Sequence, residues 1–522
     1  MTGQVVINTV AQGDIPSPHL EYGQLGPMLL VFGVAIAGVL VEALANRDWR
    51  QPIQVPLAFF GLAGAFVWTL VLGFKDKPFH VAAEGAVGID GPTLFLQGTI
   101  LVLALVSLLL IAERENSAFT PQASALPGSE AERESLASGA FQSEVYPLML
   151  FAVGGMLLFP AANDLLTMFV ALEVLSLPLY IMCGLARRRR LLSQEASVKY
   201  FLLGAFSSAF FLYGTALLYG YAGSVRFSDI AAATARNAGS EILLLAGVAL
   251  LAVGLLFKIG AVPFQAWKPD VYQGAPTPIT ALMASCTMVA AFGATLRVFY
   301  VALENLKWDW RPMMWGVAIV TMIVGAVIAI TQTDVKRMLA YSSIAHAGFL
   351  LTGVIAVSKA GLSGTLFYLA AYGFTTIGAF AIITMVRDAG GEAGHLSRWA
   401  GLGKRSPLIA GVFAFFLLAF AGIPLTSGFT GKFAVFQAAI AAGATPLVII
   451  GVISSAIAAF FYLRVIVVMF FNEPEADGPI VVASVPTAAA VALGATATVV
   501  LGVLPQPMLD LAGQAASQLF VR

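Results

Sequence analysis

Long apolar stretches, separated by short polar connections, run along most of the chain. A helix needs about 20 apolar residues to cross the hydrocarbon core of a membrane. On that basis the pattern predicts about fourteen membrane-spanning helices and an all-α integral membrane fold. Their approximate ranges are 27–45, 54–74, 92–112, 145–161, 164–186, 196–222, 241–263, 277–303, 313–332, 337–358, 361–387, 407–441, 446–471 and 481–504.

The connections are too short to form a separate soluble domain. Only residues 113–144, rich in Ser, Ala, Glu and Pro, make a long polar insert, which we expect to be a solvent-exposed loop. We therefore divide the chain by its helices alone. Residues 1–144 hold three spans and this loop, 145–303 and 313–471 hold five spans each, and 472–522 hold the last span and a tail.

Two of the predicted spans are interrupted, and each carries a lysine beside the interruption. In the seventh span Lys258 is followed by Pro263, and in the twelfth Pro424 is followed by Lys432. Proline has no backbone N–H and clashes with the preceding helical turn, and the freed backbone groups must then face protein or a hydrated cavity. The breaks are five spans apart, so spans four to eight and nine to thirteen predict two five-helix repeats. They are inverted relative to each other, because five is odd.

Ionisable side chains inside these spans are few. Glu173 lies near the middle of the fifth span, where a lone charge costs about 2.5–3.5 kcal/mol. Lys258 and Lys432 have no carboxylate nearby in the sequence, and burial beside a helix break favours the neutral form of a lysine. A carboxylate and a lysine in one dry interior can exchange a proton, so we favour a functional role over a structural ion pair for these three residues.

For two further positions, spacing alone leaves both a functional and a structural interpretation open. Lys199 follows Glu195 by four residues, a spacing that makes an ordinary helical ion pair. His346 lies midway along the tenth span and is either a proton relay or a hydrogen-bonded packing histidine.

Composition agrees with the apolar pattern. Of 522 residues, 59% are hydrophobic and 11% are charged, with a mean hydropathy of +0.88, whereas soluble domains have roughly 25% charged residues. Basic and acidic residues are equal at 28 each, so no net field indicates nucleic acid as a partner. Cys183 and Cys286 lie in separate apolar stretches, and we expect neither a disulfide nor a metal site. The first 26 residues lack the pattern of a cleaved signal peptide.

The orientation follows from basic residues, which are enriched in short cytoplasmic loops. The cluster Arg187–Arg190, between spans five and six, places that loop in the cytoplasm. Lys268 and the pair Lys336 and Arg337 fall on the same side if the chain crosses at every span. This arrangement predicts an N-terminus outside.

Several long motifs carry a resemblance to a known family. The chain resembles the antiporter-like membrane subunits of respiratory complex I, over roughly residues 145–470. The motifs are Phe257-Lys258 with Pro263-Phe264 and Trp267, Pro269-Asp270-Val271-Tyr272-Gln273-Gly274-Ala275-Pro276, Lys336-Arg337-Met338-Leu339-Ala340-Tyr341-Ser342-Ser343-Ile344-Ala345-His346, Gly422-Ile423-Pro424, Gly428-Phe429-Thr430-Gly431-Lys432-Phe433 and Glu195-Ala196-Ser197-Val198-Lys199-Tyr200. The form of the second motif is similar to subunit N rather than to its paralogues M and L.

The resemblance implies a fourteen-helix fold with an inverted repeat, and a role in coupling NADH oxidation and quinone reduction, performed by other subunits, to proton transfer. It implies that Glu173 is the span-five carboxylate, Lys199 its partner, Lys258 the span-seven lysine, His346 a relay and Lys432 the terminal lysine.

The resemblance also implies what surrounds the chain. No cofactor is expected in it, and flavin and iron–sulfur clusters are expected in partner subunits. Subunits M and K are the expected neighbours, with membrane lipid around them and the quinone pool reached through the complex. The expected location is the inner (plasma) membrane.

Two positions depart from the family pattern. Subunit N commonly has a histidine after Pro-Phe in span seven and a lysine in span eight, where this chain has Gln265 and Met288. Gln265 can hold a water but cannot carry a proton at neutral pH, and Met288 can do neither. Arg297 is too near the outer end of span eight to supply the missing charge. The central step therefore runs through water, His346 and hydroxyls such as that of Thr287, or by a modified path.

Two other classes of function remain open. A cation/proton antiporter uses the same helices in related families, and it would depend on sodium or potassium rather than on an NADH-linked partner. A scaffold that only supports a redox complex is disfavoured, because buried lysines at two helix breaks are costly and a scaffold has no use for them.

Overall fold

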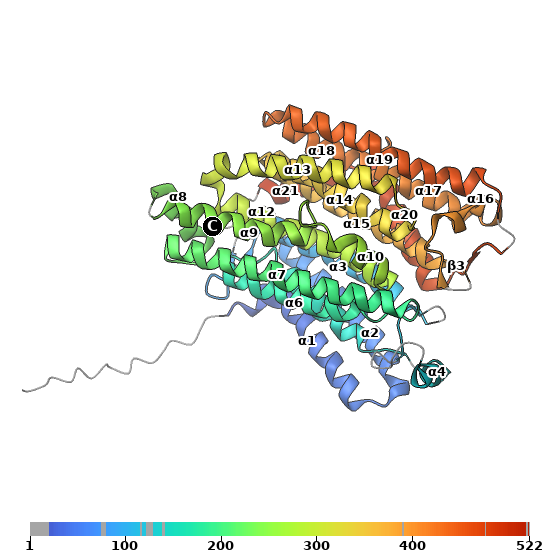
Figure 1. The fold of residues 1–522 in the computed structure, drawn as a ribbon. Coiled ribbons are helices and arrows are strands. Elements are labelled where there is room, and N and C mark those ends of the chain that lie inside the picture. Colours follow the sequence, from blue (N-terminus) through green and yellow to red (C-terminus); the bar gives the residue numbers. More distant parts are fainter. Residues whose placement is uncertain are drawn as a thin grey trace, which may run out of the picture.

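The computed structural model is an elongated bundle of long helices, with α1 and α2 along one edge and α13 and α19 along the opposite edge (Figure 1). The structure describes residues 20–74, 80–114, 117–121, 129–137, 141–237, 239–388, 391–474, 477–517 and 520. Most of the segment in which a signal peptide was considered lies outside these residues.

The helices follow the predicted apolar stretches closely. The α-helices are α1 (Tyr22–Leu44), α2 (Arg47–Gly73), α3 (Gly91–Ile111), α4 (Glu130–Ala137), α5 (Val145–Leu158), α6 (Leu165–Cys183), α7 (Arg190–Ala222), α8 (Phe227–Arg236), α9 (Glu241–Ile259), α10 (Trp267–Gly274), α11 (Thr277–Leu282), α12 (Met288–Arg297), α13 (Lys307–Ile330), α14 (Val335–Ile355), α15 (Lys359–Met385), α16 (Leu402–Arg405), α17 (Pro407–Ala421), α18 (Ser427–Ala441), α19 (Thr445–Phe471), α20 (Val485–Val503) and α21 (Gln506–Ser517).

Short irregular elements complete the chain. The π-helical turn η1 (Met283–Thr287) joins α11 to α12, and a second one, η2 (Val298–Ala302), extends α12, so that the four form one continuous span. The elements η3 (Glu304–Leu306) and η4 (Leu396–Trp399) are 3-10 turns. The strands are β1 (His80–Ala82), β2 (Val87–Ile89), β3 (Val386–Asp388), β4 (Gly391–Glu392) and β5 (Ile480–Val481). β1 pairs with β2, and β3 lies between β4 and β5, with every pairing antiparallel.

The predicted all-α membrane fold is confirmed. In the described part of the chain, twelve helices are long and apolar enough to cross a membrane, and α5 and α17 are shorter apolar helices. The number fourteen stays a prediction. The most apolar stretches of α14 and α15 are 94% buried, and that of the span from Thr277 to Ala302 is 100% buried. These three spans therefore form the centre of the bundle, whereas α1, α2 and α7 turn apolar faces outward, as helices in contact with lipid do.

Matching features recur five spans apart. Asp164 caps the N-terminus of α6 with its side chain, and Asp334 caps α14 in the same way. Each aspartate also forms an isolated β-bridge to the connection that follows the next helix, at Arg226 and at His395. Two repeats would produce these matching pairs, although the domain boundaries themselves stay predictions.

Both predicted helix breaks are present. α9 ends at Ile259 and is followed by Gly260 with φ of +78°, and α17 ends at Ala421 and is followed by Gly422 with φ of +86°. A left-handed residue after the last turn is the common end of an α-helix, and glycine adopts it without strain. The spans then continue as α10 and α18, so spans seven and twelve are discontinuous, as expected.

The polar insert differs from the exposed loop that its composition predicted. Residues 130–137 form α4, while Ser117, Phe119 and Thr120 are buried. The backbone N–H of Thr120 donates to the carbonyl oxygen of Leu185 at 2.7 Å. This part of the insert therefore packs against the connection between α6 and α7, where Phe119 is buried. Residues 115–116, 122–128 and 138–140 lie outside the described residues.

An ion pair with no exposed surface ties the start of α3 to span eight. Arg297 Nη2 lies 2.6 Å from Asp90 Oδ2, and both side chains are 0% exposed. The same nitrogen donates to Thr93 Oγ1, and Arg297 Nε donates to the carbonyl of Pro160. Arg297 is thus occupied by a structural contact and does not replace the missing central charge, as the sequence indicated.

Replacing Gly214 with alanine should destabilise the pairing of α7 with α9. A Cβ atom at Gly214 would lie 2.5 Å from Leu251 N and 2.8 Å from the carbonyl oxygen of Gly247, and backbone atoms yield little. Overpacking of this kind costs about 1–3 kcal/mol. Thermal unfolding of the purified protein in detergent should show a lower Tm. Gly220→Ala is the matched control on the same helix, since the nearest atom to its Cβ is 3.9 Å away; an equal loss in both variants would contradict the packing argument.

Candidate functional site

Lys258 lies in the last turn of α9, immediately before the first helix break, and is 4% exposed. Its Nζ donates to Ser176 Oγ of α6 at 2.7 Å and to the hydroxyl of Tyr200 of α7 at 3.2 Å. The ammonium also lies 5.4 Å from the centre of the Tyr200 ring. The lysine is therefore held by neutral groups of two neighbouring helices.

Glu173 lies on α6, one helical turn before Ser176, so the two side chains share a face of that helix. Its Oε1 is buried and has no hydrogen-bond partner within the described residues. No direct ion pair joins Glu173 to Lys258 among the described contacts, but their charges act on each other. The carboxylate is thus free to change its interaction with the lysine without breaking a direct bond.

Lys199 has different partners from the one that the resemblance implied. Its Nζ lies 2.6 Å from Glu195 Oε1 and 2.8 Å from Asp270 Oδ2, and the side chain is 42% exposed. Arg337 of α14 bonds the other oxygen of Asp270 at 2.6 Å. The expected Glu173–Lys199 pair is therefore wrong, because the α10 segment brings Asp270 against Lys199.

The helical pair between Glu195 and Lys199 is confirmed. The sequence analysis missed Asp270 and Arg337 as members of this cluster, although both lie inside motifs that it quoted. The cluster ties α7, α10 and α14 together at the end of span seven.

His346 is buried in the middle of α14, with 2% of its surface exposed. A hydrogen bond of 2.7 Å joins its Nδ1 to the hydroxyl of Tyr368, and a longer one of 3.4 Å joins Nε2 to the hydroxyl of Tyr462. The ring of Tyr372 lies 4.9 Å from the imidazole, between centroids. Both ring nitrogens therefore have hydroxyl partners, which is the arrangement that a proton relay needs and that a packing histidine can also adopt.

Lys432 lies on α18, just after the second helix break, and is 5% exposed. Its Nζ donates to the carbonyl oxygens of Phe420 and Ala421 at 2.8 and 3.0 Å and to Ser455 Oγ at 2.8 Å. These carbonyls end α17, whose last turn leaves them without helical partners. The ammonium also lies 4.9 Å from the ring of Phe349, one turn beyond His346 on α14.

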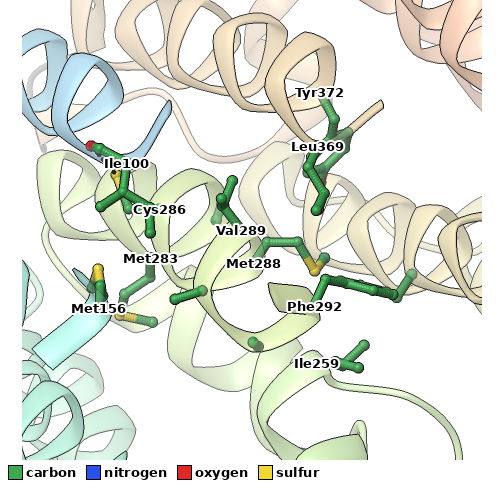
Figure 2. Packing of buried hydrophobic residues seen from close by; sticks show 14 of the residues in the cluster. Ile100, Met156, Ile259, Met283, Cys286, Met288, Val289, Phe292, Leu369 and Tyr372 are labelled. Carbon is green, nitrogen blue, oxygen red and sulfur yellow. Dashed lines mark hydrogen bonds between the residues drawn. The ribbon is translucent and has the colours of Figure 1, made fainter. Parts of the chain in front are cut away.

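The two positions that depart from the family pattern differ in character. Gln265 lies in the break between α9 and α10, and its Oε1 is buried without a hydrogen-bond partner in the described structure. Met288 is 3% exposed. Figure 2 shows Met288 among apolar side chains that include Phe292 and Leu369. Span eight therefore offers no proton carrier at this point, whereas Gln265 presents an open acceptor.

Lys268 was assigned to a cytoplasmic loop, and the structure corrects this assignment. The side chain is only 2% exposed, because it points from the start of α10 back to the end of α9, where its Nζ donates to the carbonyl oxygen of Ile259. A charged residue in a loop is ordinarily solvated, so only the contact of this side chain with the end of α9 reveals its burial.

Comparisons with known proteins agree with this arrangement. Residues 162–458 match the family model for the transmembrane part of the NADH:quinone oxidoreductase/Mrp antiporter proteins. The chain is 66% identical to NADH-quinone oxidoreductase subunit N of Rhodococcus opacus, over 96% of this chain and 97% of the relative. It is 60% identical to the protein of the same name from Mycobacterium tuberculosis strain H37Rv, over 97% of this chain and 99% of the relative.

Solved structures give the same result. A chain of respiratory complex I from Thermus thermophilus with bound aureothin is 31% identical, with a TM-score of 0.74 over 93% of this chain and 99% of that one. A chain of the Mrp complex from Dietzia has a TM-score of 0.80 at 21% identity, over 96% of this chain and 98% of that one, and at that identity it supports the fold alone.

Proposed function

Because the chain belongs to the subunit N family of NADH-quinone oxidoreductase, we propose that it conducts protons across the membrane as a redox-inactive subunit of that complex. The observation that carries this proposal is the line of buried basic side chains, Lys258, His346 and Lys432, which lie beside or between two helix breaks. Such residues in a membrane interior are costly and mark ion pathways.

The proton path begins at Glu173 and Lys258. When a charge change in a neighbouring subunit alters the interaction of Glu173 with Lys258, the ammonium gives up a proton and becomes a neutral amine. Ser176 and Tyr200, which already hydrogen-bond the lysine, position its Nζ for this transfer. The proton then moves to the hydrated centre of the bundle.

The second half of the path uses His346 and Lys432. The imidazole accepts a proton on one nitrogen while the other donates, with Tyr368 and Tyr462 as its hydrogen-bond partners. Lys432 then receives the proton beside the second break, and repulsion by the next incoming charge releases it outside. Lys199 takes part indirectly, because it fixes Asp270 and thereby the start of α10.

The surroundings follow from the same family membership. Flavin and iron–sulfur clusters belong to partner subunits in this proposal, and the chain itself holds no cofactor. Subunits M and K are its neighbours, membrane lipid covers its apolar faces, and the quinone pool is reached through the complex. The chain lies in the bacterial plasma membrane with its N-terminus outside.

A multisubunit cation/proton antiporter is the second candidate, and the fold shared with the Mrp complex favours keeping it. Purification from the native membrane in mild detergent separates the two. We expect flavin and iron–sulfur subunits to co-purify, with NADH-dependent quinone reduction in the same fraction. Other antiporter-like subunits without redox partners, together with sodium- or potassium-dependent transport, would favour the antiporter instead.

A further inference from the structure

Lys268 reaches back to the first helix break. Its Nζ donates to the carbonyl oxygen of Ile259, the last residue of α9, at 2.7 Å. A Cβ atom placed on Gly260 would lie 3.1 Å from this ammonium, so the lysine fills the space that the glycine leaves open. The ammonium group therefore sits at the break itself, against the negative end of α9.

Lys432 occupies the corresponding place at the second break. It donates to the carbonyl oxygens of Phe420 and Ala421 at the end of α17, and a Cβ atom on Gly422 would lie 3.2 Å from its ammonium. In each span the lysine comes from the helix after the break and returns to the carbonyl end of the helix before it. Lys268 is thus the local counterpart of Lys432.

Lys258 does not have this relation to the second repeat. It precedes Gly260 by two residues, and the residue that precedes Gly422 by two is Phe420. The first repeat therefore carries two buried lysines, one on each side of its break. The sequence analysis assigned one lysine to each break and counted Lys258 as the equivalent of Lys432.

The environment of Lys268 leaves most of its hydrogen-bonding capacity unused. An ammonium group has three protons to donate. Within the described part of the chain Lys268 makes one hydrogen bond, to Ile259, and no ion pair. Capping one carbonyl requires only a neutral donor, and burying a cation without a counter-ion is costly. The cap alone therefore does not explain why a lysine occupies this position.

On one side Lys268 faces the surroundings of His346. Its Nζ lies 5.9 Å from the centre of the Tyr272 ring. Tyr372 contacts the imidazole, and Ser343 Oγ, on the same helix as His346, is buried without a hydrogen-bond partner among the described residues. The charges of Lys268 and Lys432 both act on His346.

On the other side two aromatic rings connect the surroundings of Lys268 to Lys258. Lys258 bonds the hydroxyl of Tyr200, whose ring stacks on Trp267 with centroids 4.7 Å apart. Trp267 precedes Lys268 in the chain. The unpartnered Oε1 of Gln265 lies in the same break and can accept a hydrogen bond from a bridging water.

We propose that Lys268 is a proton-relay residue between Lys258 and His346, in the part of the path where span eight presents Met288. Its neutral amine accepts a proton released by the Lys258 ammonium, and the resulting Lys268 ammonium passes a proton to the imidazole of His346. Each step moves one proton, needs no oxidant or reductant, and regenerates the amine. The inference rests on the proposed proton-conducting function.

The test uses the complete complex reconstituted in vesicles, with proton uptake and NADH oxidation measured together. In Lys268→Gln the amide can still donate to Ile259, and in Lys268→Arg the charge also remains, but neither side chain releases a proton at neutral pH. We expect both variants to assemble and to lose proton uptake to the same extent as Lys258→Met. A residue that only caps α9 would be replaced by arginine without this loss.

Each other outcome is informative. Wild-type proton uptake in either variant, while Lys258→Met is inactive, would overturn the relay role of Lys268 and leave the proposed function intact. Failure of both variants to assemble would assign the lysine to structure and would also overturn it. Full uptake in Lys258→Met would instead contradict the proposed function itself.

Discussion

We expect the replacement of Lys258 with alanine to abolish proton transport by the assembled complex, while the redox subunits remain bound. The substitution removes the group that accepts and releases the proton and leaves Ser176 and Tyr200 without their shared donor. Loss of one positioned proton-transfer group slows transfer by about 10²–10⁴-fold. Proton uptake by vesicles containing the complex, driven by NADH and quinone, measures the effect directly.

A surface lysine provides the control for Lys258→Ala. Lys404 pairs with Glu473 on an exposed face, where its side chain is 52% exposed, so Lys404→Ala makes the same chemical change away from the bundle interior. Exposed ion pairs contribute about 0–1 kcal/mol, and transport should be unchanged in this variant. Full transport by a correctly assembled Lys258→Ala complex would exclude Lys258 from the path.

Lys432→Ala should stop transport at the last step. The Nζ of this lysine donates hydrogen bonds to three acceptors beside the second break. Among the described residues no other cation bonds the same carbonyls. Without it a proton that reaches His346 has no basic group to receive it, and we expect a loss of the same order as for Lys258→Ala. The ratio of protons moved to NADH oxidised gives the measurement.

Replacing Ser455 with alanine tests how much of the transport loss in Lys432→Ala comes from a single hydrogen bond of the lysine. Ser455 Oγ accepts one of the three hydrogen bonds of Lys432, at 2.8 Å, while both carbonyl acceptors remain. Transport should fall less than in Lys432→Ala, because the lysine stays in place. Equal losses in the two variants would indicate that the serine, rather than the lysine, limits the outer step.

The apolar pattern was sufficient to predict the membrane helices. A stretch of about 20 apolar residues in lipid has few alternatives to a helix, since every backbone polar group must be satisfied within the segment. The two breaks were equally local, because a glycine ends each preceding helix and Pro263 or Pro424 follows it within a few residues. The pair of Glu195 and Lys199 also followed from spacing along one helix.

The contacts between helices could not be predicted from the local sequence. Lys199 meets Asp270 across 71 residues of sequence, and His346 meets Tyr462 across 116. An apolar helix in lipid gains no hydrophobic energy by choosing one neighbour over another, so small residues and polar contacts decide the packing. For this reason the sequence could name Glu173, Lys258, His346 and Lys432 as candidates but could not supply their partners.

Lys268 shows most clearly the difference between what the sequence predicts and what the tertiary structure decides. By sequence alone it is a charged residue in a connection rich in proline and polar groups, and such residues are ordinarily solvated. Its burial and its bond to Ile259 exist only because the side chain reaches from α10 across the break to the end of α9. The sequence by itself determined the membrane spans, their two breaks and the ionisable residues within them. The tertiary structure alone decided which of those residues meet, because those contacts come from the packing of segments far apart in the chain.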